Sequence, residues 1–370
     1  MSASARNRTT DRHGAAVRLG IRHPIVQGPF GGGLSTVQLA ATVSNLGGLG
    51  SYGAHVLEPD DILHTDAQLR AATDQPYALN LWVSDHDPGG EDLDPAAFER
   101  AWRVFAPWFT ELGLPQPAAP RRSHPAFADQ VEALLEARPP VFSFVFGIPS
   151  ARVLTECRRR GIVTAGAATT PAEARALDAA GVDLIVATGA EAGGHRPSFL
   201  APAEESLYGT FALVQVVSAQ VSVPVIAAGG IADGRGVRAA LALGAQAAQV
   251  GTAFLACEES GTTPVHRQAL FGAGAEHSLL TRSFTGRLAR GLRNGWTDAM
   301  GSKPLPPFPV TSWFVSQLRP QALAQGRTDL VSLWAGQIAP RLVHRRATDL
   351  MRELVSGLES PLPVPPEINA

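Results

Sequence analysis

One histidine is placed where it could do chemistry. His195 follows Gly193 and Gly194 in the stretch GAEAGGHRPSF (189–199), directly after the apolar run LIVAT (184–188). Glycines beside a reactive side chain let a flat or charged group come close to the backbone. An imidazole can act there as a base or hydrogen-bond an anion. A lone histidine is more often an ordinary polar loop residue, but the glycine pair and the position after an apolar run favour a functional site.

Two glycine-rich turns suggest a phosphate site. GGIADG (229–234) and the pair Gly251-Thr252 each follow an apolar run. Such turns present backbone N–H groups, and a helix that starts there adds the positive end of its dipole. We therefore predict that a phosphate monoester contacts Gly229, Gly230, Gly251 and Thr252. Tight turns with no ligand are the alternative.

The sequence lacks the residues that several other kinds of chemistry require. Lys303 is the only lysine, which excludes a Walker P-loop and disfavours a Schiff base. The histidines form no HxH or HExxH pattern, and Cys157 and Cys257 form no CxxC, so we expect no metal and two buried thiols in a reducing compartment. GLGSYG (48–53) matches GxGxxG, but no helix begins at its third glycine, so we reject a dinucleotide site there.

The elements that must position these residues alternate along the chain. Helical, alanine-rich stretches separate short and almost continuously apolar runs, as expected for strands covered on both faces. The predicted strands are PIVQG (24–28), LGSY (49–52), YALNLW (77–82), VFSFV (141–145), IVTAG (162–166), LIVAT (184–188), PVIAA (224–228) and AAQVG (247–251). Eight such units predict an α/β fold, a (β/α)8 TIM barrel, in which chemistry lies at the carboxyl ends of the strands.

The rest of the chain suggests additions to this barrel. We assign residues 14–257 to the barrel, with an Asp-, Pro- and Gly-rich excursion at 83–123. Residues 258–335 carry many Arg, Pro and Trp and are predicted to form a helical cap over the barrel mouth, and residues 336–358 a closing helix. The polar N-terminus is expected to be a flexible tail, and PLPVPPEINA an extended one.

Composition narrows the range of partners. The 370 residues have a formal net charge of −2, and no basic run offers a footprint for nucleic acid or an anionic membrane. No apolar run approaches the roughly 20 residues that span a bilayer. The N-terminus has no apolar core of a secretory signal, so we expect a cytoplasmic protein, with a homodimer considered as its assembly.

A set of motifs in the same order resembles a known family. PIVQGPF, SNLGGLGSYGA, YALNLWV, GAEAGGHR, VPVIAAGGIADGRG, GAQAAQVGTAFL, GRLARGLRN and LWAGQ together look like the nitronate monooxygenases, over roughly residues 20–345. AAGGIADGRG alone is shared with related flavin barrels. The resemblance implies a TIM barrel with non-covalent FMN, oxidation of alkyl nitronates by O2 through a flavin semiquinone, and no metal.

The resemblance also assigns residues by motif position. Gly28, Pro29 and Phe30 would line the flavin ring, Asn80 would hydrogen-bond its polar edge, and Gly193 and Gly194 would flank it. The four turn residues named above would hold the phosphate, and the end of that site would be closed by Trp334, Gly336 and Gln337. His195 matches the catalytic histidine, as a base or as a residue that positions the anion.

Three positions depart from the family pattern. Gly28-Pro29-Phe30 stands where Ala-Pro-Met is usual, and Thr188, still expected beside the flavin, replaces a glutamine and removes one ring donor. Val145 occupies the middle of a motif that often reads Phe-His-Phe, which leaves His195 without a second histidine in the matched motifs. These changes put the substrate in doubt more than the cofactor.

Alternatives therefore stay open. An NADH- and FMN-dependent enoyl-acyl-carrier-protein reductase shares this barrel, and the arginine-rich RLARGLR (287–293) would suit its acidic carrier. An FMN oxidoreductase acting on another small acid and a flavin-binding scaffold are further interpretations. Arg196, Arg290 and Arg293 are candidates for attracting a substrate anion, and Ser283 and Thr285 are either site residues or cap residues only.

Overall fold

The computed structural model describes residues 14–84, 87 and 93–359. Its centre is a ring of eight parallel strands in the order β1-β9-β8-β6-β5-β4-β3-β2, and a bridge between Val26 and Leu49 joins β1 to the residue before β2. The strands are β1 (Ile25–Gln27), β2 (Gly50–Gly53), β3 (Tyr77–Trp82), β4 (Val141–Val145), β5 (Val163–Ala168), β6 (Leu184–Thr188), β8 (Val225–Ala228) and β9 (Ala247–Val250). All eight predicted strands are present, and the TIM barrel is confirmed. β2 runs through the GxGxxG match.

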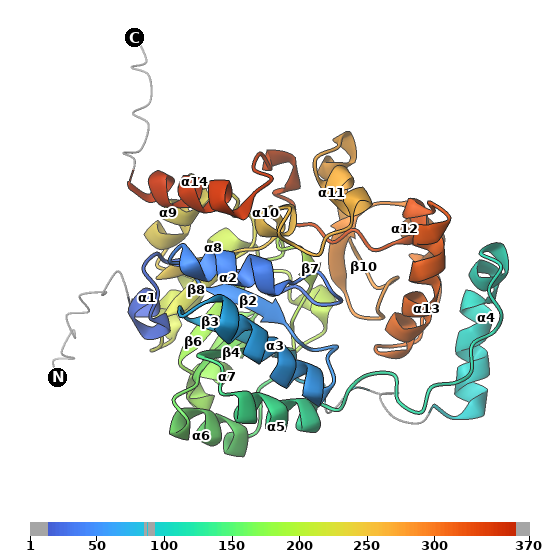
Figure 1. Ribbon diagram of the computed structural model, residues 1–370, viewed down its shortest axis with the longest axis horizontal. Helices are drawn as coiled ribbons and strands as arrows, with labels where there is room; N and C mark the ends of the chain where they lie inside the picture. The colour runs from blue at the N-terminus through green and yellow to red at the C-terminus, as the bar shows by residue number, and fades with distance from the viewer. Residues whose placement is uncertain (1–13, 85–86, 88–92, 360–370) are drawn as a thin grey trace, which may run out of the picture.

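Helices surround the ring, as Figure 1 shows. They are α2 (Val37–Asn45), α3 (Pro59–Ala72), α5 (Phe127–Ala137), α6 (Ala151–Arg159), α7 (Pro171–Ala180), α8 (Thr210–Gln220), α9 (Gly234–Ala242) and α14 (Ala347–Glu359). α14 packs against both α9 and α2, so this last helix connects the final helix of the barrel with its first one and completes the ring of helices. At the amino ends of the strands, α1 (Gly14–Leu19) contributes Ala15 and Leu19 to the apolar interior.

The helix ends follow local chemistry. The Thr36 hydroxyl accepts a hydrogen bond from the Leu39 N–H (2.9 Å) and caps α2. α7 begins with Pro171 after the capping residue Thr170 and ends at Gly181, which has φ +79°. Proline suits a first helical turn and glycine suits the left-handed end, so these boundaries could be read from the sequence.

The segment predicted as a helical cap also contains a sheet. Its helices are α11 (Pro264–Leu270), α12 (Gly295–Met300) and α13 (Val310–Ala324), and the short α10 (Thr252–Leu255) precedes the segment, directly after β9. Between them, β10 (Ser278–Thr281) pairs antiparallel with β11 (Ala289–Leu292), which pairs with the two-residue β7 (Gly194–His195). The cap therefore reaches back to the loop after β6.

The excursion after β3 holds a long helix, α4 (Pro95–Glu111), which lies beside α13 at one edge of the molecule (Figure 1). Its Phe98, Phe105 and Phe109 are buried in a second apolar core with Trp296 and Phe314 of the cap. Excursion and cap are thus packed as one unit beside the barrel.

The predicted closing helix starts later than expected. α14 begins at Ala347, and residues 336–346 are irregular apart from a short turn, η4 (Ala339–Arg341). The Gly336 N–H donates to Thr252 Oγ1 (2.9 Å) and the Gln337 N–H to the Glu191 carbonyl (2.9 Å), so these amides serve barrel loops instead of a helix.

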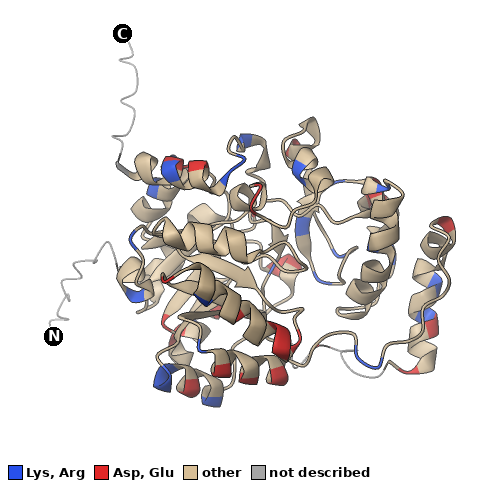
Figure 2. Ribbon diagram, viewed as in Figure 1, with Lys and Arg blue, Asp and Glu red and all other residues tan. Residues whose placement is uncertain are grey.

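Figure 2 shows acidic and basic residues interspersed on the outer helices. Among the described residues, no helix is both long and apolar enough to cross a membrane. Cys157 and Cys257 are free and buried, as predicted. The two predicted tails fall largely on residues 1–13 and 360–370, outside the described part of the chain.

Candidate functional site

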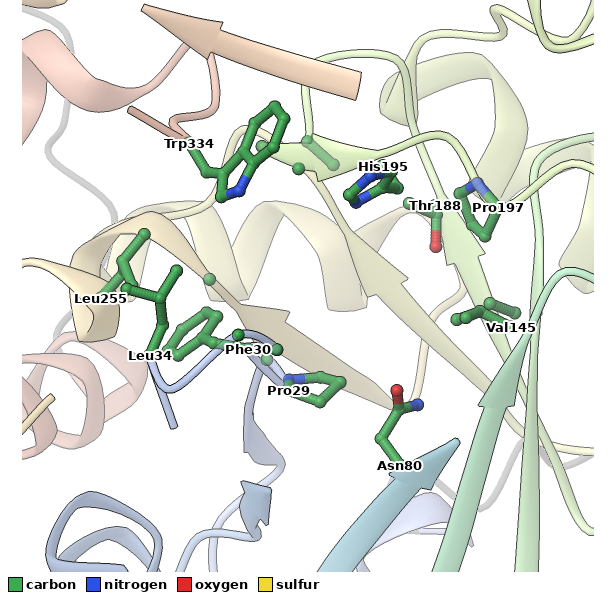
Figure 3. Close-up of a pocket in the computed structure, with 18 of the residues that line it drawn as sticks. Pro29, Phe30, Leu34, Asn80, Val145, Thr188, His195, Pro197, Leu255 and Trp334 are labelled. Atoms are coloured by element: carbon green, nitrogen blue, oxygen red, sulfur yellow. The ribbon is translucent and has the colours of Figure 1, made fainter. Parts of the chain in front are cut away.

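A cavity of about 380 Å³ opens at the carboxyl ends of the barrel strands, between them and the cap (Figure 3). Of the residues assigned from the sequence to catalysis and cofactor binding, all but Gln337 line it: Gly28, Pro29, Phe30, Asn80, Thr188, Gly193, Gly194, His195, Gly229, Gly230, Gly251, Thr252, Trp334 and Gly336. Gln337 does not line the cavity. Through its bond to Glu191 it fixes the loop beside it.

The turn after β1 gives the cavity a flat wall. The Gly28 N–H donates to the Val250 carbonyl (2.9 Å), and a Cβ on Gly28 would lie 3.3 Å from the Gly251 Cα. A Cβ on Gly31 would lie 1.8 Å from His55 Cε1, so only glycine fits there. Backbone with little side chain is a surface on which a planar ring can lie.

Asn80 is oriented by its neighbour. It is buried near the end of β3, and its Nδ2 donates to Ser143 Oγ (2.9 Å). That bond leaves the amide oxygen as an acceptor for an N–H group in the cavity. Thr188, at the end of β6, points into the same space in Figure 3.

The turns after β8 and β9 form an open cradle. Gly230 has φ +70°, and a Cβ on Gly251 would meet nothing within 4 Å. The first N–H groups of α10 have no partner within the helix, because helix amides bond four residues back. The acidic side chain at this end, Glu191, is engaged elsewhere, since its carboxylate accepts from the Thr210 N–H and hydroxyl (2.9 Å each).

His195 is held by the cap. Its backbone pairs with Ala289 of β11, and its Nε2 is 2.9 Å from Thr285 Oγ1. Gly194, the first residue of this short strand, has φ +74°, which favours glycine. Burial, and then the positive charge of Arg287, lower the pKa of His195 to about 3, so the ring is neutral at physiological pH.

Aromatic rings surround this histidine. The Trp82 ring meets it edge-on at 4.7 Å between centroids, and Trp334 lies at 5.2 Å. Phe146, 6.2 Å away, has φ +68°. A bulky residue rarely adopts that backbone conformation, and such strain concentrates at functional sites.

Arg287 is a buried cation that the sequence did not reveal as special. Its guanidinium lies between the rings of Phe146 (3.7 Å) and Phe308 (4.4 Å) and forms an ion pair with Asp87. Contacts with aromatic faces stabilise a cation that burial would otherwise penalise. Its positive charge contributes to the lowered pKa of His195.

Two further histidines join the cavity from outside the matched motifs. The His55 ring stacks on Trp82 at 3.8 Å with an interplanar angle of 5°, and His124 lies parallel to His55 at 6.0 Å. Burial lowers the pKa of both. His195 therefore has histidine neighbours even though Val145 replaces the one expected after β4. Tertiary stacking brings them together, and no local pattern marks them.

Arg196, proposed as an anion attractor, is structural instead. It is 1% exposed and donates to the carbonyls of Gly189 (2.6 Å) and Ser206 (2.8 Å). The buried Glu173, whose charge acts on Arg196, accepts a hydrogen bond from the Phe199 N–H (2.6 Å). These two buried charges fix the loop that follows His195.

The other two proposed arginines also lie outside the cavity lining. Arg290 donates to the Ala190 carbonyl (2.9 Å) and to Ser278 Oγ (3.2 Å). Arg293 pairs with Asp298 on the surface (2.7 Å). Ser283 accepts from Thr281 away from the cavity, whereas Thr285 lines it. Among the described residues, no three His, Cys, Asp or Glu side chains are grouped to hold a metal.

Comparison with known proteins agrees with this geometry. Residues 16–357 match the family model for nitronate monooxygenase. A nitronate monooxygenase of Pseudomonas aeruginosa is 42% identical, over 92% of this chain and 97% of its own, and a probable one of Bacillus subtilis is 35% identical over 86% and 91%.

Two solved structures share the fold of this chain over most of its length. A nitroalkane oxidase from Streptomyces ansochromogenes superposes with a TM-score of 0.84 at 35% identity, over 93% of this chain and 98% of its own. FabK from Thermotoga maritima superposes with a TM-score of 0.72 at 28% identity, over 93% and 95%. The chain is thus an oxidoreductase with a TIM barrel and belongs to the nitronate monooxygenase family.

Proposed function

We propose that this protein binds FMN and uses O2 to oxidise alkyl nitronates, with His195 positioning the anion. The observation that carries the proposal is a neutral histidine in an aromatic pocket, directly between glycine turns that a flavin ring and its phosphate would fit. Nitroalkanes, the protonated forms of nitronates, are the second substrate.

The cavity suits FMN on its own geometry. The space beyond Gly251 is open where a side chain would project, which is the shape of a cradle for a phosphate monoester. The Thr252 hydroxyl already accepts from the Gly336 N–H, so its proton is free to be donated to a phosphate oxygen. Asn80 and the flat turn after β1 supply the acceptor and the surface for the ring. Bound FMN would supply the electron acceptor.

His195 is better suited to hold an anion than to remove a carbon-bound proton. A group whose pKa is about 3 is a weak base in the empty cavity. When its Nε2 accepts the Thr285 hydroxyl proton, the neutral ring can still donate one hydrogen bond from Nδ1 to a nitro oxygen. A nitronate has already lost its proton and needs only this positioning. The geometry therefore favours the nitronate over the nitroalkane.

The rival reductase is not favoured by the charges near the mouth. In the stretch 287–293, Arg287 is paired with Asp87, Arg290 is buried, and Arg293 is paired with Asp298. These arginines leave no unpaired basic patch for an acidic carrier protein.

The test is anaerobic mixing of the FMN-loaded protein with ethyl nitronate, and separately with NADH, while flavin absorbance is followed. Reduction by nitronate and not by NADH supports the proposal, and the reverse supports the reductase. H195N should keep its flavin and lose roughly 10- to 100-fold in kcat/KM for nitronate, because a hydrogen bond to a charged group is worth about 1.5–3 kcal/mol. The control H64N changes an exposed histidine on α3 and should match the wild type. Unchanged turnover in H195N would remove its assigned role.

A further inference from the structure

One face of the cap helix α13 looks into the cavity. Ser312, Val315, Ser316 and Arg319 line the space, and their spacing of three and four residues places them on one side of the helix. The opposite side carries Phe314 and Leu318, which are buried in the second core. The helix is therefore oriented by its apolar side, and its polar side is presented to the cavity.

Among the described residues that line the cavity, Arg319 is a charged side chain without an ionic partner. Among the described residues that line the cavity, only Glu191 and Arg319 carry a full charge at neutral pH. Glu191 is occupied by Thr210, as described above. Arg319 forms no ion pair within the described part of the chain, and its Nη1 has only a long contact of 3.5 Å with the Gly32 carbonyl. One positive charge thus faces the cavity uncompensated.

The other positive groups near the cavity are compensated or neutral. Arg287 is paired with Asp87 behind the aromatic wall, and His195 is uncharged. Arg319 is partly buried, and this partial removal of its charge from water lowers its pKa. A partly desolvated cation gains most from an anion, because charge pairs strengthen as water is excluded. A neutral molecule of the same shape gains far less.

We propose that Arg319, together with Ser312 on the same face of α13, forms an oxyanion-binding site that admits the nitronate form of the substrate in preference to the neutral nitroalkane. This inference rests on the proposed function for its substrate. The guanidinium donates to the nitronate oxygens and the Ser312 hydroxyl adds a neutral donor. The step is binding only, with no bond made or broken.

Binding of an unreactive anion tests the site without turnover. Nitrate has the planar oxygen–nitrogen–oxygen shape of a nitronate head, and its affinity for the FMN-loaded protein can be measured by calorimetry. R319Q should raise the Kd of nitrate about tenfold, which is about 1.4 kcal/mol. R319K, which keeps the charge, should recover most of the affinity. R103Q removes one charge from the exposed surface of α4 and should leave the Kd unchanged.

Turnover then tests the selectivity. With ethyl nitronate, R319Q should lower kcat/KM about tenfold through KM, whereas with nitroethane kcat/KM should change little. Equal losses on the two forms, or an unchanged nitrate Kd in R319Q, would overturn the inference. Loss of FMN from R319Q would also overturn it, because Arg319 would then hold the cofactor's phosphate. If the wild type turned over no nitronate, the proposed function would fail while the nitrate titration still decided on the site.

Discussion

His195 should stay uncharged throughout the pH range in which the protein is assayed. Its pKa of about 3, against an ordinary value of about 6.5, corresponds to about 5 kcal/mol against charging the ring. At pH 5 an ordinary histidine is about 97% protonated, whereas His195 should be about 1% protonated. The two expectations differ enough for one experiment to separate them.

The assay is a titration of the imidazole ¹⁵N resonances of the FMN-loaded protein between about pH 5 and 8, with H195N to assign the signal. The His195 resonances should not shift over this range, because its pKa of about 3 lies below it. The double variant R287Q/D87N, which removes the buried charge pair, should raise the pKa of His195 without restoring the ordinary value, because burial is the larger cause. A wild-type midpoint at the ordinary value would refute both the neutral histidine and the preference for nitronate derived from it.

Three further outcomes follow from the same geometry. The pKa of His266 is lowered to about 4, so as the pH falls the unfolded chain takes up a proton at this histidine before the folded protein does. Lowering the pH from about 7.5 to 5.5 should therefore reduce the free energy of unfolding by about 1.4 kcal/mol through this residue. The denaturation midpoint of H266Q should fall less over that interval than the midpoint of the wild type. G251A places its Cβ in open space, so the variant should fold normally but bind FMN roughly tenfold more weakly in a fluorescence titration. G336A places its Cβ 2.8 Å from the Glu191 carbonyl, so it should instead lower the melting temperature, through about 1–3 kcal/mol of overpacking. Unaltered FMN affinity in G251A would contradict the assigned cradle, and a normal melting temperature in G336A would contradict the tight packing.

The barrel could be predicted because its signals are local. Each strand is a short apolar run, and each turn that lines the cavity directly follows one, so the sequence alone places glycines such as Gly229 and Gly251 at the barrel mouth. α4 had a local signal as well: Asp94 caps it, Pro95 opens it, and aromatic residues recur at Phe98, Phe105 and Phe109. The Asp, Pro and Gly around it obscured that pattern.

What the sequence could not predict depends on partners far away in the chain. The stack of His55 on Trp82 and the seat of Arg287 between two phenyl rings are tertiary contacts with no spacing rule. β7 has only two residues and exists because β11 pairs with it. The spacing of residues could show that α13 has a polar face, but it could not show which cavity that face lines.

The residues that orient His195 are synthesised long after it, because they lie in the cap. Its side-chain partner Thr285 follows it by 90 residues, and its strand partner lies in β11, later still. On the ribosome, every barrel strand has therefore been synthesised before the segment that fixes the histidine exists. A nascent chain that has just completed β9 already contains the glycine cradle, but its histidine has neither hydrogen-bond partner nor neighbouring strand. The glycine turns of the proposed cofactor site are thus complete earlier in biosynthesis than the contacts that orient the histidine, and Trp334 and Gly336, which also line the cavity, come later still.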